Sequence, residues 1–324
     1  MKRAIPLLLL PLLLLAAAPV LAQQQAQYSQ YMNNNYILNP GTTGVEDYID
    51  VKFSYRTQWT GLEGAPKTYY ASASSSLGKW RTTSKRTIRD RRRPFHAIGG
   101  LVYRDETGPT SRTGAYASYA YNLVLRPDLR VALGLSAGMQ QFAVDGQKLQ
   151  FFDPTTQAPS ASSRVLDGSV GLWLYSSRFY LGLSGAQLLG NQLNFSYGPG
   201  LQGEGAPGNT LKRHYFATGG VRVQLNDDWS LVPSVLVKAV NPAPLSVDLN
   251  AKLKYQDLLW AGVSWRAFDS AVAIVGLSYE QFTLGYSYDA GLSELAGYHG
   301  GSHEVLLGLR LKKKSQVVCS NRFW

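Results

Sequence analysis

The chain has 324 residues, 45% of them apolar, and its 32 basic and 21 acidic side chains give a formal net charge of +11. A single cysteine, Cys319, excludes an internal disulfide framework. Basic proteins often bind nucleic acid, but the N-terminal leader described next exports the chain, so we expect no nucleic-acid partner.

Residues 1–22 have the composition of a secretory signal peptide. Lys2 and Arg3 give a positive start, an apolar run follows, and Val20-Leu21-Ala22 fits the cleavage rule of such leaders. We therefore predict cleavage between Ala22 and Gln23. The alternative is an uncleaved anchor, although the apolar run is too short for a spanning helix and is interrupted by prolines.

The segment 23–48 precedes the first predicted strand. It is rich in Gln, Asn and Tyr and lacks a regular alternation of apolar and polar residues. We expect it to lie in the periplasm or to fold into the lumen of the barrel predicted below. Eight strands leave a packed interior and sixteen or more leave a channel, so a plugged lumen and a narrow pore are both open at this strand count.

Strict alternation of apolar and polar residues is the main signal after residue 48. From Leu245 to Tyr255 every odd position is apolar and every even position is polar. This period of two is that of a strand with one apolar face. Segments of about ten residues suit tilted strands that cross a bilayer, whereas a soluble sandwich normally uses shorter strands. The apolar face is therefore predicted to meet lipid, and the polar face to line a wet lumen.

The pattern predicts about fourteen strands, and an even number closes an antiparallel barrel with both termini on one side. Their predicted spans are 49–59, 67–76, 95–104, 113–124, 129–141, 165–175, 178–188, 213–224, 229–239, 246–255, 258–266, 271–279, 282–289 and 303–312. The predicted fold class is all-β, a single closed antiparallel transmembrane β-barrel over residues 49–312, followed by a C-terminal tail over 313–324.

Connection lengths predict an orientation, because barrels of the bacterial outer membrane have short periplasmic turns and longer external loops. From the fourth connection onward the even connections are tight turns, and the odd connections include the long segments 142–164, 189–212 and 290–302. The tight turns are therefore predicted in the periplasm and the long loops outside the cell.

The second connection, 77–94, is long although it falls on the predicted periplasmic side. Its basic residues are Lys79, Arg81, Lys85, Arg86, Arg89, Arg91, Arg92 and Arg93. The simpler interpretation is a solvated loop. The functional interpretation is electrostatic contact with an acidic partner or with lipid headgroups.

Short motifs follow one another in a characteristic order along the chain. They include Gln27-Tyr28-Ser29-Gln30-Tyr31-Met32, Leu38-Asn39-Pro40, Tyr55-Arg56-Thr57-Gln58-Trp59, Arg213-His214-Tyr215-Phe216 and Gly301-Ser302-His303-Glu304. In order and spacing this set resembles the PorP/SprF family, outer-membrane proteins of the type IX secretion system of Bacteroidetes. The resemblance covers nearly all of the mature chain. It marks as structural or partner-binding positions Tyr55, Arg56, Gln58, Trp59, Arg213, His214, Tyr215, Phe216, Gly301, Ser302, His303 and Glu304.

The resemblance implies a barrel that assists the secretion or surface retention of adhesin-like cargo carrying a C-terminal sorting domain. Some members of the family instead serve the core machinery and contact peptidoglycan-associated and motor components in the periplasm. The arginine-rich stretch 85–93 departs from the common pattern, as does Asn33-Asn34-Asn35, where an aromatic residue is frequent. The sub-type and the cargo therefore remain open.

No arrangement of residues predicts catalysis, a cofactor or a metal. Ser302, His303 and Glu304 are adjacent, but neighbouring strand residues point to opposite faces and cannot form a nucleophile–base relay. The four histidines are too scattered in the sequence to predict a metal site. We expect a protein that is not an enzyme, with an outer-membrane hydrolase as a weak alternative.

Two further groups of residues carry expectations about the barrel wall. Asp248, Lys252, Arg222 and Lys238 share the inward parity and are expected to form cross-strand ion pairs in a wet lumen or to line a selective passage. Tryptophans near predicted strand ends are expected to form an aromatic girdle at the lipid headgroups. They are Trp59, Trp80, Trp173, Trp229, Trp260 and Trp265.

Two functions follow from these observations. The first is an outer-membrane accessory of type IX secretion that holds a cargo's sorting domain through the external loops, with membrane lipid and other secretion components as further partners. The alternative is a passive porin or solute transporter. Conductance across planar bilayers separates the two.

Overall fold

The computed structural model describes residues 25–77, 94–149, 159–195, 210–267, 269–292 and 297–311. Nearly all of its regular structure is β-strand. The strands are β1 (Ile49–Thr57), β2 (Lys67–Ser76), β3 (Phe95–Thr107), β4 (Thr110–Arg126), β5 (Leu129–Val144), β6 (Ala161–Tyr175), β7 (Phe179–Ala186), β8 (His214–Val221), β9 (Val223–Gln224), β10 (Trp229–Val240), β11 (Ser246–Tyr255), β12 (Leu259–Arg266), β13 (Ser270–Tyr279), β14 (Phe282–Gly291) and β15 (Ser302–Leu311).

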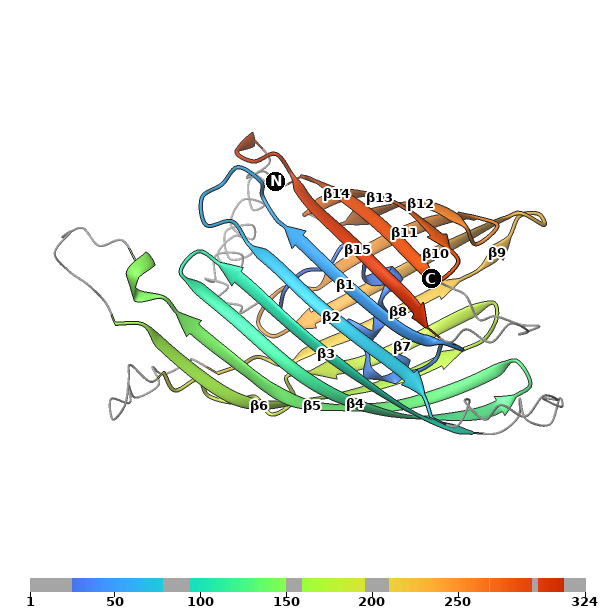
Figure 1. Cartoon of the computed structure of the whole chain (residues 1–324), viewed down its shortest axis with the longest axis horizontal. Helices are drawn as coiled ribbons and strands as arrows, with labels where there is room; N and C mark the ends of the chain where they lie inside the picture. The colour runs from blue at the N-terminus through green and yellow to red at the C-terminus, as the bar shows by residue number, and fades with distance from the viewer. Residues whose placement is uncertain are drawn as a thin grey trace, which may run out of the picture.

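The strands form one closed antiparallel barrel (Figure 1). Strands that follow one another in sequence pair with one another, and β15 pairs with β1 to close the wall. β8 and β9 are separated only by Arg222 and both pair with β10, so they form one wall strand. The wall therefore has fourteen strands, as predicted. Closure satisfies the backbone hydrogen bonds of both would-be edge strands, which a bilayer requires because it offers no water to satisfy them.

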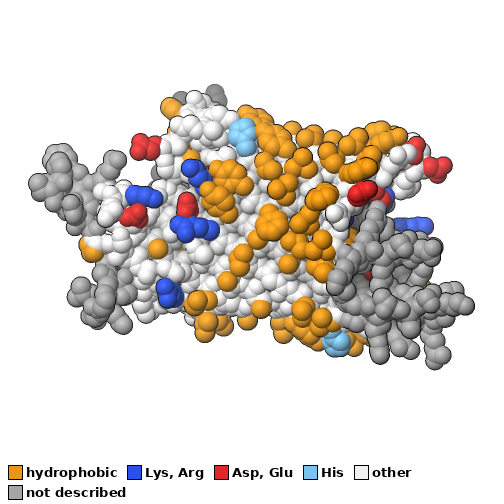
Figure 2. Space-filling view, viewed as in Figure 1, with side chains coloured by type: hydrophobic (Ala, Val, Ile, Leu, Met, Phe, Trp, Pro, Cys, Tyr) orange, Lys and Arg blue, Asp and Glu red, His pale blue; other side chains and the backbone are white. Residues whose placement is uncertain are grey.

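Apolar and polar side chains occupy opposite faces of this wall. On β7 the outward Leu181 is 54% exposed, whereas the inward Tyr180 is buried. On β11 Leu249 faces outward, and Asp248 and Lys252 are buried on the inner side. Figure 2 shows hydrophobic side chains gathered over the middle of the wall, with charged side chains toward its two ends. This is the surface expected of a barrel surrounded by lipid.

Most strand boundaries differ from the prediction by one to four residues, and β3, β4 and β1 show why. β3 and β4 run on to the pair Thr107–Thr110, so the third connection is the two-residue turn Gly108-Pro109 and not a loop. Gly108 has a positive φ of 55°, which glycine adopts at no steric cost. β1 ends at Thr57 because Trp59 has left the extended region, with a φ of 46°.

The connections separate into two ends. The tight turns 127–128, 176–178 and 280–281 lie at one end, which we call the turn end. The segments 145–160 and 187–213 lie at the other, which we call the loop end. The usual rule for outer-membrane barrels predicts that the loop end is external and the turn end periplasmic.

The basic connection 77–94 joins β2 to β3 at the turn end, because β2 stops at Ser76 and β3 starts at Phe95. Its eight basic residues lie outside the described residues, as do Trp80, the predicted signal peptide with Ala22, Gln23, and the predicted tail 313–324.

The predicted tryptophan girdle is wrong for two of its members. Trp173 and Trp260 are buried and face the lumen, because both sit at inward positions of their strands. Trp229 and Trp265 face outward as expected. Tyrosine supplies much of the outward aromatic surface near the loop end, at Tyr55, Tyr69, Tyr286 and Tyr288. Among the described residues, no helix is long and apolar enough to cross a membrane.

Candidate functional site

Residues 25–48 lie inside the barrel (Figure 1). The Oε1 of Gln27 accepts a hydrogen bond from the Nη1 of Arg266, at the loop end of β12, at 3.0 Å. Val45 packs with Ala132 and Val232, close to the turn end of β5 and β10. The segment therefore crosses the lumen from the loop end to the turn end, and we call it the lumenal segment.

Three short 3₁₀ turns shape the lumenal segment: η1 (Tyr31–Asn33), η2 (Asn35–Ile37) and η3 (Pro40–Thr42). Such turns satisfy only part of the backbone, so the segment depends on the wall for its remaining contacts. Four groups of wall residues provide them.

The first group, which we call the outer latch, is a buried charged cluster near the loop end. The backbone N–H of Ser29 donates to Glu304 Oε2 at 2.7 Å, and its hydroxyl donates to Asp289 Oδ2 at 2.5 Å. Arg56 forms ion pairs with Asp289 at 2.7 Å and with Glu304 at 3.5 Å. Gln30 Nε2 donates to the Glu304 carbonyl at 2.9 Å. A buried cation thus holds two buried carboxylates, and both carboxylates hold the lumenal segment.

A second charged cluster lies on β10, β11 and β12 toward the loop end, where Asp248 lies 3.2 Å from Lys238 Nζ and 3.5 Å from Arg266 Nε. At the turn end Arg222 forms a separate pair with Asp257 at 3.4 Å. These are pairs between neighbouring strands or between a strand and a turn. Asp248, Arg222 and Lys238 therefore face the lumen as expected, and each forms an ion pair on the inner face of the wall.

Lys252 is the fourth of the inward residues and differs from the others. Its side chain is 3% exposed, yet among the described residues no carboxylate lies within 4.0 Å of its ammonium. It donates to Asn33 Oδ1 at 3.1 Å and lies 5.7 Å from the ring centre of Trp260. The cations Lys52 and Lys254 are among its electrostatic neighbours. The lumenal segment thus gives this ammonium a neutral acceptor.

The third attachment is apolar. Tyr31 and Met32 of η1 are buried against Phe216, Leu236 and Trp260 of the wall. Tyr31 also accepts a hydrogen bond from Asn250 Nδ2 at 2.6 Å. Inward aromatic residues of the wall, which alternation alone assigns to a wet lumen, therefore serve as the docking surface for this turn.

The fourth attachment is a row of wall glycines beneath Asn39 and Pro40, which we call the glycine seat. A Cβ added to Gly171 would meet Asn39 Oδ1 at 1.9 Å, and one added to Gly134 would meet the Pro40 carbonyl at 2.2 Å. A Cβ on Gly182 would meet Asn39 Nδ2 at 3.0 Å. Gly134 is needed because the backbone of Pro40 and Gly41 lies directly over it, and Gly171 is needed because the Asn39 side chain and the Gly41 nitrogen occupy the space of a Cβ. At Gly182 the nearer obstacle is the Trp173 ring of the wall, at 2.3 Å.

The hydrogen bonds of Asn39 fix the position of the lumenal segment on the glycine seat. Its Nδ2 donates to the carbonyl oxygens of Leu172 at 3.1 Å and Leu183 at 3.2 Å, on β6 and β7. Its Oδ1 accepts from the Gly41 N–H at 2.8 Å and so caps η3. One side chain therefore joins the lumenal segment to two strands.

Tyr36 lies between the latch and the seat in the chain. Its hydroxyl contacts the Ser118 hydroxyl on β4. This contact joins the lumenal segment to a further strand.

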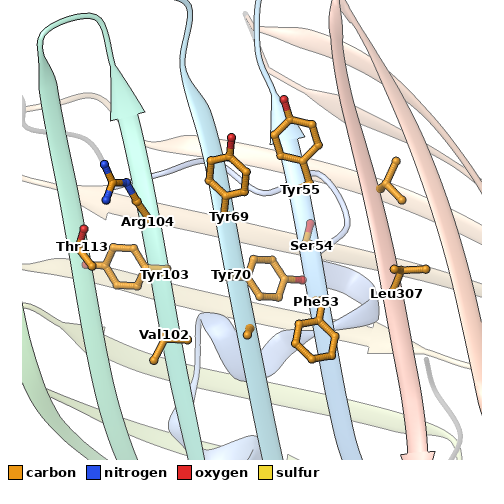
Figure 3. Close-up of a pocket in the computed structure, with 12 residues that line it drawn as sticks. Phe53, Ser54, Tyr55, Tyr69, Tyr70, Val102, Tyr103, Arg104, Thr113 and Leu307 are labelled. Carbon is orange, nitrogen blue, oxygen red and sulfur yellow. The ribbon is translucent and has the colours of Figure 1, made fainter.

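The outer wall carries an open groove of about 550 Å³ (Figure 3). Tyr55 and Tyr69 stack at a centroid distance of 4.9 Å on one side, and Phe53, Val102 and Leu307 continue the lining. The groove is on the lipid-facing side of β15 and β1 to β4, away from the lumenal segment. Among the described residues, no group of three His, Cys, Asp or Glu side chains lies together as a metal site would require.

Residues 20–309 match the sequence profile of the family described as the type IX secretion system membrane protein PorP/SprF. The chain belongs to the PorP/SprF family. With its closed barrel and apolar outer wall, this PorP/SprF protein resides in the outer membrane as a multi-strand barrel. The family is one of secretion-associated membrane proteins, and not one of known enzymes.

Solved structures similar to this PorP/SprF protein are outer-membrane barrels of low identity. The toluene transporter TbuX of Ralstonia pickettii has 10% identity and a TM-score of 0.46, covering 87% of this chain and 93% of its own. Omp33 of Acinetobacter baumannii has 11% identity and a TM-score of 0.44, with coverages of 83% and 100%. The translocator domain of NalP from Neisseria meningitidis has 12% identity and a TM-score of 0.43, with coverages of 81% and 87%. No curated protein sequence matches the chain.

The PorP/SprF motif residues fall into three places. Those facing the lumen are Arg56, His214, Phe216, Ser302 and Glu304. Those facing outward are Tyr55, Tyr215 and His303. Those at the loop end, beside the strands, are Gln58, Trp59, Arg213 and Gly301. The structure brings Arg56 to Glu304, and Trp59 N donates to Ser302 Oγ at 3.2 Å, but the twelve positions do not form one site.

The run Ser302-His303-Glu304 divides between the two faces, as its strand position predicts. His303 Nδ1 lies 2.7 Å from the hydroxyl of Tyr286 on the outer face, whereas Glu304 belongs to the outer latch. Sequence reasoning missed the latch itself and the glycine seat. Inward parity could have flagged Asp289, but its partner Ser29 lies outside the alternating strands.

Proposed function

We propose that this PorP/SprF protein is an accessory of type IX secretion that assists the export or surface anchoring of an adhesin-like cargo through the cargo's C-terminal sorting domain. Family membership supports the secretion role. The observation that carries the accessory role is the lumenal segment. Because residues 25–48 occupy the lumen, the loop end is the part of the barrel left for a secreted partner to bind.

The loop end offers exposed apolar residues for such a contact. Tyr298 is 75% exposed, and Leu189, Leu245 and Leu292 are also exposed in connections at this end. Exposed aromatic and aliphatic residues above the lipid are typical binding hot spots. We propose that the cargo's sorting domain covers this surface, and that other secretion components meet the turn end.

Co-purification tests the proposal. We expect the double variant Tyr298→Ser, Leu189→Ser to recover at least about tenfold less cargo than the unchanged protein, because hot-spot truncations cost affinity on this scale. Leu225→Ser is the matched control, since Leu225 is as exposed as Leu189 but lies at the turn end.

The expected control result is unchanged recovery with Leu225→Ser. Equal recovery of cargo with the double variant and with this control would show that the loop end does not hold the cargo. The alternative function, a passive porin, predicts steady conductance from the unchanged protein in planar bilayers.

A further inference from the structure

The lumenal segment is held only by non-covalent contacts, and many of them are with groups that water can also satisfy. Ser72 accepts from Asn34 Nδ2 at 3.0 Å, and Ser184 donates to the Leu38 carbonyl at 2.7 Å. The ion pairs of the outer latch join wall residues to one another, so their formation does not require the segment. A wall of this kind remains stable when wet, as the lumen of a porin does.

The barrel is also wide enough to enclose more than its own wall side chains. Eight strands leave room only for packed side chains, whereas sixteen or more enclose a channel. Fourteen strands enclose a space that this chain fills with its own residues 25–48. The contents of the lumen therefore determine whether it conducts.

The charges of the segment and the wall are complementary. The segment's only charged residues are Glu46 and Asp47. The wall holds Lys52, Lys252 and Lys254 near the turn end, and of these Lys252 has no carboxylate within 4.0 Å among the described residues. Withdrawal of the segment would leave Lys252 facing open water without a carboxylate partner, beside the paired Lys52 and Lys254.

We propose that the barrel contains a latent passage for small hydrophilic solutes, preferentially anions, which residues 25–48 close by sitting on the glycine seat. This inference goes beyond the accessory role and does not rest on it. The seat is the control point because Asn39 donates to carbonyl oxygens of both β6 and β7 there. A Cβ at Gly171 would also displace the Asn39 side chain, and a Cβ at Gly134 would displace the Pro40 backbone.

The test is conductance of purified protein in planar bilayers. Gly171→Ala places a methyl group at 1.9 Å from Asn39 Oδ1 and should unseat the segment. Gly168→Ala is the matched control in the same strand, because its Cβ would meet only the Ser136 carbonyl at an ordinary 3.5 Å. Asn39→Ala removes the hydrogen bonds to β6 and β7 and introduces no clash. We call it and Gly171→Ala the opening variants, and Asn39→Ala tests the proposal if Gly171→Ala does not fold.

We expect the unchanged protein and Gly168→Ala to give closed traces, and both opening variants to raise the time-averaged conductance at least about tenfold, as loss of two to three hydrogen bonds predicts. In a salt gradient the reversal potential should favour chloride over potassium. Adding Lys252→Gln to an opening variant should reduce that preference for chloride. Ion flow that leaked around the outside of the barrel would not change with this substitution.

Two results would overturn the inference. One is a closed trace from both opening variants when each migrates as a folded barrel on an unheated gel. The other is conductance whose ion preference does not respond to Lys252→Gln. Neither result bears on cargo co-purification, so the accessory role is judged separately.

Discussion

At the scale of single residues, Arg56 is the cation that joins the two carboxylates of the outer latch. It is buried, pairs with Asp289 and Glu304, and donates to the Ser29 hydroxyl at 2.8 Å. Removal of one member of a buried charge cluster leaves the others desolvated and unpaired, which costs more than the intact cluster ever contributes.

We therefore expect Arg56→Ala to lower the free energy of unfolding by about 3–5 kcal/mol, the usual cost of leaving buried charges unpaired. Urea unfolding of the barrel in lipid vesicles measures it. The control is Arg104→Ala, which removes an exposed pair with Glu106 at 2.5 Å on the outer wall and should cost no more than about 1 kcal/mol. Equal losses for the two variants would contradict the role given to the latch.

The sequence assigns the inward face of Arg56 and Glu304 by parity, but it cannot pair them. The two residues are opposite one another only because β15 closes against β1. Likewise, the sequence shows the glycines of the seat only as glycines within strands. Their role becomes visible only when the path of residues 39–41 through the lumen is known. Parity predicts the face of a residue, whereas its partner depends on the closure of the whole ladder.

At the scale of elements, alternation predicted every wall strand and missed what continues beyond the apolar pattern. β3 and β4 extend to Thr107 and Thr110 through polar residues, because ladder hydrogen bonds need no apolar side chain. The lumenal segment has no period of its own, so its two possible locations could not be separated from the sequence. Its position depends on contacts with many different strands.

The basic connection 77–94 is the element whose role the sequence leaves most open. It leaves and re-enters the wall at the turn end. Replacing Arg89, Arg91, Arg92 and Arg93 by Gln should reduce co-purification of periplasmic secretion components at low salt. The reason is that attraction between exposed charges acts over about 8–10 Å at physiological salt and is screened further as salt rises.

In that experiment the unchanged protein at high salt is the internal control, since it should lose the same partners as the glutamine variant at low salt. If recovery of the partners changes neither with salt nor with the substitution, the connection 77–94 is a solvated loop without a role in binding them.

At the scale of the whole molecule, the structure is a membrane barrel whose interior is built from its own N-terminal residues. The outer wall meets lipid, the loop end carries exposed apolar residues, and the turn end joins the basic connection. The fold class and strand count were predictable from a local period, whereas the filled lumen and the latch required the closed structure.

The accessory role makes its most direct prediction for living cells. In a strain that lacks this protein, we expect the surface display of at least one cargo with a C-terminal sorting domain to fall, and complementation with the unchanged protein to restore it. The variant Tyr298→Ser, Leu189→Ser should fold and reach the outer membrane but fail to restore display, whereas Leu225→Ser should restore it. Normal display of every sorted cargo in the deletion strain would contradict the account.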